Sequence, residues 1–510
     1  MNRTEARQAI AAIPQTDAAT AFNVGLDLLR NDHAEILLPI ARKLARKFPR
    51  EPRMQQLLGL AARTAQDSTL ALEAFGQAAK LAPSDPLIAH SHARCALEAG
   101  APAVALFQRA VEMAPTDGHA LLGMGAALLH EGRAQDAVDH LDTLLAANPL
   151  WIDGHRDAAH IRGQMGLDPY ATITKALAGQ PRSLELTTLL AGTRLEALDF
   201  EGALAGLQDA RGKLGDPASL RILAAHAMSE LGNLSEADTT FGTLAPGSSV
   251  NDTSLHARHH LRAGRAAKAA ALIEPVIARD YDHLLWPYLS LAWRLTENPR
   301  YRWLEADERL ISVYDLGNIL GDLDVLASHL RHLHFASAQP LDQSVRGGTQ
   351  TDGNLLLRTS APIRKLRKAI LAKVADHVAQ LPPFEAGHPT LLKDRDPLRV
   401  AGSWSVRLKD EGFHSDHVHS KGWISSALYI TLPDTIGQAQ DRGKGETDHS
   451  GWLTLGESRD ILPGLEPVRL VEPKQGRLVL FPSTMWHGTR PFSAGERMTV
   501  AFDIARPQQS

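Results

Sequence analysis

The stretch Gly412-Phe413-His414-Ser415-Asp416-His417-Val418-His419 organises this chain, together with Trp486-His487-Gly488 and Glu496-Arg497-Met498-Thr499. His417 and His419 are two residues apart, so on one strand both imidazoles would face the same side. His487 follows about seventy residues later and Arg497 ten residues after it. Three such imidazoles could bind one metal ion with coordination positions left open, and a guanidinium can bind a carboxylate through two hydrogen bonds.

The residues after Pro397 read as short strands bounded by Gly, Pro and Asp. We expect strands over 400–408, 423–432, 451–455, 468–471, 476–481 and 497–504. Regular spacing of this kind predicts an all-β sandwich or jelly roll. Ahead of it, a polar, glycine-rich stretch over 339–353 is unlike any helix, and one amphipathic helix over 361–381 is ended by two prolines.

The first part of the chain is rich in helix formers and is interrupted by proline at regular intervals. Pro49, Pro83, Pro115 and Pro149 are separated by 34, 32 and 34 residues, and each follows an apolar helical stretch. Small residues and an aromatic recur at fixed offsets before them, and glycine falls where a turn between two helices belongs. A helix-ending proline at a period of about 34 residues is the signature of tetratricopeptide repeats (TPR). The chain resembles that family over roughly 20–280, with one irregular repeat expected near 160–185.

Arrays of this kind usually bind an extended peptide or a partner helix on their concave face. The alternative is a spacer or a dimerisation element that touches no substrate, and the sequence does not fix an oligomeric state. Six histidines on these helices are expected to be surface or hydrogen-bonded core residues rather than metal ligands. They are His90, His92, His119, His155, His259 and His260.

Aromatic residues are concentrated after the repeats, where the helical pattern continues without its period. Six tryptophans and tyrosines lie between residues 286 and 314, although aromatic residues make up only 5% of the chain. We expect this stretch to be a packed interface between the array and the C-terminal part of the chain, rather than a free linker.

Composition and charge exclude several classes of protein. With 510 residues the chain is too long for one core, and 44% hydrophobic with 22% charged residues are typical of a soluble globular protein. A net charge of −4 gives no general field for nucleic acid or anionic lipid. No apolar run is long enough to span a membrane. A single cysteine, Cys95, allows no internal disulfide, so we expect a cytoplasmic protein with no nucleic-acid or membrane partner.

Six segments of the C-terminal part carry a family likeness: 343–351, 412–419, 422–430, 476–483, 486–492 and 496–503. Together they resemble the 2-oxoglutarate- and Fe(II)-dependent oxygenases of the prolyl-hydroxylase-like group, and more narrowly a bacterial and phage branch of it. The likeness covers about 331–510. It implies an α+β domain with a double-stranded β-helix (jelly-roll) core, and Fe(II), 2-oxoglutarate and O2 as cofactor and cosubstrates.

The resemblance also implies roles for individual residues. His417 is the first iron ligand and His487 the distal one, and both are implied to be catalytic. Arg497 anchors 2-oxoglutarate, with Thr499 and Tyr429 beside it. The position of the family's usual carboxylate ligand falls at His419, so either His419 is a third histidine ligand or it only orients a water.

A competing frame exists, because His414-Ser415-Asp416 is itself a His-x-Asp sequence. It lies in the opposite strand phase to His417 and His419, so both pairs cannot point at one metal without a bulge. The spacing of Gly412-Phe413 in the family favours the later pair. A further alternative is a zinc-binding or structural barrel without oxidation, since ligation by nitrogen alone would suit zinc.

These observations predict a multidomain protein: a superhelical TPR array over 1–282, an aromatic-rich helical join over 283–330 and an oxygenase domain over 331–510, with its barrel core at about 398–506. The function we expect is a dioxygenase that hydroxylates a peptide or protein side chain presented by the array, an expectation that rests on architecture. The alternatives are an interaction scaffold with a degenerate or metal-sensing barrel, and a small-molecule hydroxylase.

Overall fold

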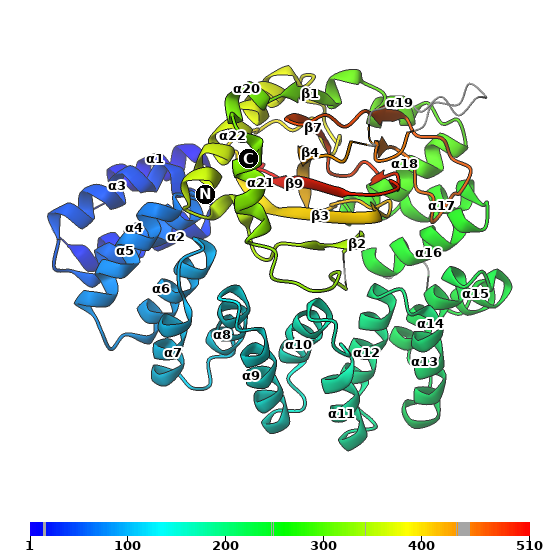
Figure 1. Cartoon of the computed structure of the whole chain (residues 1–510), viewed down its shortest axis with the longest axis horizontal. Helices are drawn as coiled ribbons and strands as arrows, with labels where there is room; N and C mark the ends of the chain where they lie inside the picture. Colours follow the sequence, from blue (N-terminus) through cyan, green and yellow to red (C-terminus); the bar gives the residue numbers. More distant parts are fainter. Residues whose placement is uncertain are drawn as a thin grey trace.

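A computed structural model of the chain describes all residues except 14–16, 246, 248, 342, 435, 437–448 and 510. A curved array of helices wraps around a domain built on β-sheets (Figure 1). The first helices, in blue, lie on one side of this domain, and the green helices that end the array lie on the other. The fold class is the expected one, a superhelical TPR array followed by an α+β domain with a jelly-roll core.

The helices of the array come in antiparallel pairs that stack on one another, with few residues between them. They are α1 (Arg3–Ala11), α2 (Ala18–Arg30), α3 (Ala34–Lys47), α4 (Pro52–Thr64), α5 (Ser68–Leu81), α6 (Pro86–Glu98), α7 (Val104–Met113), α8 (Gly118–His130), α9 (Ala134–Ala147), α10 (Ile152–Gln164), α11 (Ala171–Gly179), α12 (Leu184–Glu196), α13 (Phe200–Leu214), α14 (Ala218–Glu230), α15 (Leu234–Phe241), α16 (Val250–Arg262) and α17 (Ala266–Ile273). The irregular repeat expected near 160–185 corresponds to the short α11 and the connection that precedes it.

Local chemistry explains where these helices begin and turn. Asp85 caps α6, because its carboxylate accepts hydrogen bonds from the amides of Leu87 and Ile88. Gly100, in the turn after α6, has a φ of +71°, a conformation that costs glycine least. Between repeat helices, a Cβ on Gly59 would lie 2.9 Å from the ring of Phe75, so only glycine allows this close contact.

Within the residues that the structure describes, the join and the C-terminal domain add five α-helices and nine strands. The helices are α18 (Trp286–Leu295), α19 (Arg300–Glu305), α20 (Gly317–Leu320), α21 (Leu323–Arg331) and α22 (Ala361–Gln380). The strands are β1 (Ser312–Asp315), β2 (Val345–Gln350), β3 (Val400–His414), β4 (Gly422–Thr431), β5 (Leu453–Leu455), β6 (Arg469–Val471), β7 (Arg477–Pro482), β8 (His487–Thr489) and β9 (Glu496–Ala505).

Two antiparallel sheets form the jelly roll. The larger has the strand order β1-β7-β4-β9-β3-β2 and the smaller the order β6-β5-β8. In the large sheet Tyr429 of β4 is paired with Thr499 of β9. Helix α22 belongs to the buried cluster under this sheet, where Leu366, Ile370 and Val374 share a core with strand residues. The three apolar side chains recur at four-residue steps, as expected for a helix with one buried face.

The glycine-rich stretch is not helical, as expected, and it contains β2, which pairs with β3 across an irregularity at Gly347. Two expectations need correction. The join is not wholly helical, because residues 312–315 form β1 and pair with β7 at the edge of the large sheet. His417 and His419 do not lie on a strand, since β3 ends at His414 and an irregular segment carries both.

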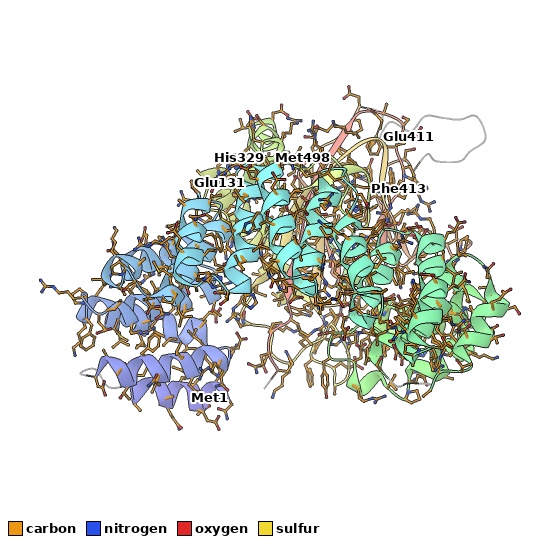
Figure 2. The ribbon with its side chains drawn as sticks, turned by 90° about the horizontal axis from the view of Figure 1, so that it is seen from below. Met1, Glu131, His329, Glu411, Phe413 and Met498 are labelled. Atoms are coloured by element: carbon orange, nitrogen blue, oxygen red, sulfur yellow. The ribbon has the colours of Figure 1, made fainter. Side chains whose placement is uncertain are left out.

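The aromatic join is the packed interface that the sequence predicts. The indole N–H of Trp486 donates to the carbonyl of Pro287 at 3.0 Å, and Tyr288 meets the Trp486 ring edge-on. Seen from below, the helices of the array run across the sheet domain from the end that begins at Met1 (Figure 2). Within the described part of the chain, none of the helices combines the length and the apolar character needed to cross a membrane.

Candidate active site

The structure brings His417, His419 and His487 together. His487 opens β8, and an isolated antiparallel bridge joins it to His417, with backbone N–H···O distances of 2.9 and 3.0 Å. One ligand nitrogen from each of the three rings lies within 4.8 Å of the other two. The ring centroids of His417 and His487 are 4.2 Å apart. Segments from two distant parts of the chain therefore present three imidazoles to one point.

The hydrogen bonds of these rings fix their tautomers. Nδ1 of His417 lies 2.8 Å from the carbonyl oxygen of Ser415, and Nδ1 of His487 lies 3.0 Å from that of Met485. Nδ1 of His419 lies 2.8 Å from a carboxylate oxygen of Asp503. Because these oxygens can only accept, each Nδ1 carries the proton and each Nε2 keeps its lone pair. All three histidines are set up to ligate through Nε2.

Burial keeps two of the rings neutral. It lowers the pKa of His417 to about 3, and it lowers the pKa of His487 well below its usual value. The neighbouring imidazoles act in the same direction, since a proton on one disfavours a proton on the next. A neutral imidazole is the form that binds a metal, so these two sites are ready for a cation at neutral pH.

Arg497 is a buried cation with no acidic partner among the described residues. It is 2% exposed, and its guanidinium lies over the ring of Tyr429 at 5.2 Å. Its Nε has no hydrogen-bond partner, and the contact from Nη2 to the Thr489 hydroxyl is long, at 3.5 Å. Burial lowers the pKa of Arg497. A buried guanidinium left in this state is suited to an incoming anion.

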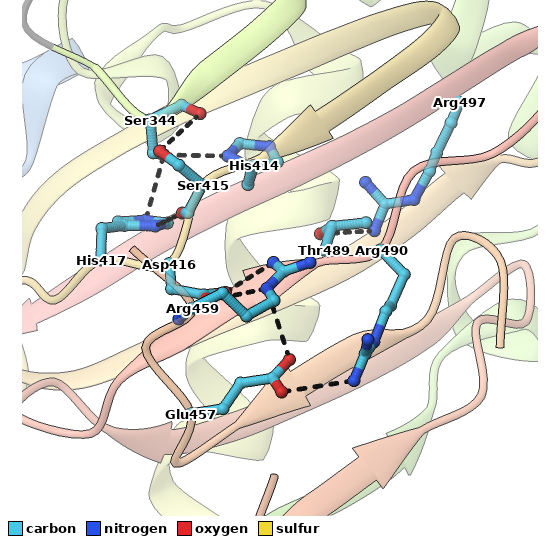
Figure 3. Close-up of polar contacts among 10 residues, drawn as sticks. All are labelled: Ser344, His414, Ser415, Asp416, His417, Glu457, Arg459, Thr489, Arg490 and Arg497. Carbon is cyan, nitrogen blue, oxygen red and sulfur yellow. Dashed lines mark hydrogen bonds and ion pairs between the residues drawn. The ribbon is translucent and has the colours of Figure 1, made fainter. Parts of the chain in front are cut away.

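One cavity collects these groups. Arg497 and Thr499 line it beside the three histidines, and Tyr429 lies buried under the guanidinium. Sequence reasoning missed other parts of its wall, which are Gln343, Ser344, Gln350, Trp404, Ser426, Leu453 and Thr489. The Ser344 hydroxyl contacts Nε2 of His417 at 3.2 Å and Nδ1 of His414 at 3.0 Å (Figure 3).

The residues of the competing frame take other partners. Asp416 accepts two hydrogen bonds from the guanidinium of Arg459, at 2.7 and 2.8 Å (Figure 3). The backbone amide of Arg459 donates a third hydrogen bond to the same carboxylate. Its carboxylate is thus neutralised by an arginine. His414 lines the cavity and contacts Ser344, but it is not in the group of three ligand nitrogens.

A second group of possible ligands lies in the array, and two of its three residues, Asp238 and His259, already have other polar partners. Asp238, His259 and His260 have ligand atoms within 4.8 Å of one another. The guanidinium of Arg265 lies 2.7 Å from Asp238 and 3.0 Å from Nε2 of His259. Nδ1 of His259 also contacts the Ser229 hydroxyl. His259 is thus a hydrogen-bonded core residue.

Asp503 is the most consequential residue that the sequence patterns did not single out. It is buried on β9, where it contacts His419. Residues 497, 499, 501 and 503 alternate along one strand, so they share the face that carries Arg497. An acid at an even spacing from Arg497 is the signal that could have found it.

Parts of the chain are similar to solved structures. MamA from Desulfovibrio magneticus RS-1 is 18% identical, with 33% of this chain and 98% of that chain covered at a TM-score of 0.29. A prolyl-4-hydroxylase from Pseudomonas putida is 17% identical, with 39% and 94% covered at a TM-score of 0.25. HygX from Streptomyces hygroscopicus, with nickel and 2-oxoglutarate bound, is 13% identical, with 38% and 82% covered at a TM-score of 0.27.

Three segments of the chain match known families. Residues 402–503 match the family described as "Putative 2OG-Fe(II) oxygenase". Residues 25–86 and 101–156 each match a family described as "Tetratricopeptide repeat". No curated protein matches this chain. The chain therefore contains two segments that match tetratricopeptide repeats, followed by a segment that matches the 2OG-Fe(II) oxygenase family.

Proposed function

We propose that this oxygenase uses Fe(II), 2-oxoglutarate and O2 to hydroxylate a side chain of a peptide or protein. The observation that carries the proposal is one cavity that holds three Nε2 lone pairs and a buried guanidinium whose Nε has no hydrogen-bond partner. A metal ion needs the first feature and a dicarboxylic cosubstrate needs the second. A barrel with only a structural role would need neither the cluster of imidazole nitrogens nor the buried guanidinium.

The residues present fit a divalent metal. His417, His419 and His487 would hold it, since their Nε2 atoms face one point and their Nδ1 atoms are engaged elsewhere. When bound, Fe(II) supplies the O2 chemistry: one oxygen atom enters a substrate C–H bond as a hydroxyl, and the other enters succinate as 2-oxoglutarate loses CO2. The protein orients the imidazoles and excludes bulk water from around them.

Arg497 would bind the far carboxylate of 2-oxoglutarate. Its guanidinium can donate two parallel hydrogen bonds, and the hydroxyl of Thr499 on the same face of β9 can add a third. The ring of Tyr429 supports the guanidinium from below by a cation–π contact. Burial strengthens all these interactions because little water competes for the carboxylate.

The substrate class is inferred from the array. TPR arrays generally mediate protein or peptide interactions. Gln350 at the end of β2 lines the active-site cavity, and two residues later Asp352 accepts a hydrogen bond from Gln164 of α10. A second cavity of about 290 Å³ lies between α6, α8 and α10 and residues 352–358. A peptide held there on the concave face would lie close to the β2 wall of the site.

Succinate release tests the activity. Protein loaded anaerobically with Fe(II) is mixed with 2-oxoglutarate and O2, and succinate is measured with the peptide fraction and the small-metabolite fraction of one lysate. We expect stimulation by the peptide fraction and its loss in His487→Ala. Stimulation by the small-metabolite fraction alone would show a small-molecule hydroxylase. Release that is absent with both fractions, or unchanged in His487→Ala, would refute the oxygenase.

Removal of the anchoring guanidinium tests the cosubstrate site. Arg497→Ala loses two charge-assisted hydrogen bonds, so the Kd of 2-oxoglutarate should rise about 100-fold or more. The visible absorption of the Fe(II)–2-oxoglutarate complex measures this Kd in the absence of O2. Arg407→Ala is the matched control, because Arg407 lies opposite Met498 on the neighbouring strand and pairs with Glu496 outside the cavity. An equal effect of both variants would contradict the assignment.

A further inference from the structure

Three imidazole ligands would bring no negative charge to the candidate metal site. A bound divalent ion would keep its full charge, and the buried cation Arg497 lines the same cavity. Sites of non-haem iron commonly include a carboxylate ligand, which offsets one unit of that charge. Asp416 cannot do so here, because Arg459 already neutralises it. The negative charge must come from another group near the ligands.

Asp503 is that group. Asp503 is 8% exposed, and its carboxylate contacts Nδ1 of His419 at 2.8 Å. The Ser425 hydroxyl donates to the same carboxylate at 2.6 Å. Among the described residues its only ion-pair partner is His419. Within that part of the chain, Asp503 is therefore a buried carboxylate whose charge no lysine or arginine offsets.

His419 differs in this respect from the other two histidines. His417 and His487 donate their Nδ1 protons to neutral backbone carbonyls, whereas His419 donates to a charged carboxylate. A carboxylate acceptor makes the opposite ring nitrogen a more basic ligand and holds the ring in one orientation. The edge of Trp404 contacts the His419 ring at 5.3 Å between centroids, which further restrains it.

We propose that Asp503 is the positioning residue of the metal site, and that through His419 it supplies the negative charge that a carboxylate ligand would otherwise supply. The inference rests on the proposed function only in that His419 binds the metal. Asp503 does not touch the metal in this arrangement. It acts by fixing the tautomer of His419 and by polarising its ring.

Metal affinity tests this without any turnover. Calorimetric titration with Co(II) of the full chain should show Asp503→Asn binding 10- to 100-fold more weakly, which is the usual cost of losing such a partner. The amide keeps the shape and an acceptor oxygen but loses the charge. Ser425→Ala is the matched control: it removes the hydroxyl's contact to Asp503 and its longer contact of 3.3 Å to Nδ1 of His419, but it leaves the contact between Asp503 and His419, so its loss should be clearly smaller. Affinity within twofold of the wild type in Asp503→Asn would overturn the proposal.

A double-mutant cycle separates this role from a structural one. In a His419→Ala background, Asp503→Asn should cause no further loss of Co(II) affinity, because its route to the metal has gone. An undiminished loss in that background would show that Asp503 only supports the fold, and would overturn the proposal. The melting temperature of each metal-free variant reports folding independently.

Exchanging the charge between the two positions gives the sharpest outcome. His419→Asp places a carboxylate ligand at the metal itself, so the charge of Asp503 is no longer needed there. In that background Asp503→Asn should change Co(II) affinity by less than twofold, instead of the 10- to 100-fold loss expected in the wild-type chain. A loss as large as that in the wild-type chain would count against the proposal. Failure of succinate release by the wild type, with the metal-affinity pattern intact, would refute the proposed oxygenase and leave the role of Asp503 standing.

Discussion

The helical array contacts the oxygenase domain in different ways at its two ends. At the first end, Arg399 ahead of β3 forms ion pairs with Asp32 and Glu35, and Gln66 exchanges two hydrogen bonds with the backbone of Val400. At the other end the contact includes an apolar core, together with hydrogen bonds from Arg262 and Arg294 to backbone carbonyls of the C-terminal domain. Helices α16 to α18 share a buried cluster with Ile461 and Trp486 of the oxygenase domain, and Val418 packs against it.

This difference matters because of where the apolar contact lies. Val418 is the residue between His417 and His419, and Trp486 directly precedes His487. Both ligand-bearing segments are therefore packed on the last helices of the array together with α18 of the join. Partly exposed ion pairs contribute up to about 1 kcal/mol each, whereas a buried tryptophan contributes several. The end of the array supports the candidate metal site. The ion pairs of Arg399 with Asp32 and Glu35, which we call the polar clamp, hold its beginning to the same domain.

Trp486→Ala should have the largest effect. Trp486 is 4% exposed and its N–H is bonded to Pro287, so truncation leaves a cavity and should cost about 3–5 kcal/mol of unfolding free energy. Co(II) affinity should fall as well, since the His487 backbone loses its support. Urea denaturation and calorimetry measure the two quantities. Trp452→Ala, a half-buried tryptophan next to β5, is the control. A large stability loss with unchanged Co(II) affinity would show that the array does not position the ligands.

Glu305 makes the same apolar end sensitive to pH. It is buried on α19, and burial raises its pKa to about 7, against the hydrogen bond from Ser290. Between pH 4.5 and 7 the unfolded chain loses this proton while the folded protein keeps it. This group therefore stabilises the fold less as pH rises, and the whole change is on the order of 3 kcal/mol.

Glu305→Gln tests this directly. The unfolding free energy of the variant should increase relative to that of the wild type as pH rises from about 5 to 8, by up to roughly 3 kcal/mol. Glutamine keeps an acceptor for Ser290 and has no proton to lose. Denaturant titrations at several pH values measure the difference. Glu308→Gln, at an exposed neighbour, is the control for the loss of one carboxylate. Equal profiles for the two variants would contradict a raised pKa at Glu305.

The sequence predicts the array and most of the sheet well because both depend on local, periodic signals. The proline period marks the repeats, and alternating apolar residues mark β3, β4, β7 and β9. The aromatic join was also predictable as an interface, since tryptophans seldom gather on a free linker. Family likeness pointed to the three histidines and Arg497, whereas the strand assumed for His417 and His419 was wrong.

What the sequence hid depends on pairing between distant segments. Four residues form β1 only because β7 lies beside them, and no local alternation marks them. A Cβ on Gly348 would lie 2.5 Å from the Arg407 carbonyl, so β2 owes its glycine to a close approach that becomes visible only in the fold. His417 is placed by its bridge to His487 and not by a strand. The role of Asp503 required the same three-dimensional information.

Arg399→Ala should have the smallest effect and completes the comparison. The guanidinium pairs with Asp32 and with both carboxylate oxygens of Glu35, and the acids are partly exposed. Loss of this polar clamp should therefore cost only about 1 kcal/mol of unfolding free energy, and the loss should shrink at high salt because exposed pairs are screened. Co(II) affinity should not change, because the ligand-bearing segments pack on the opposite end of the array. Denaturation at low and high salt measures the unfolding free energy and its salt dependence, and calorimetry on the same samples measures the Co(II) affinity. If Arg399→Ala weakened Co(II) binding as Trp486→Ala is expected to do, the array would act on the metal site as one rigid body, and the division between its ends would be wrong.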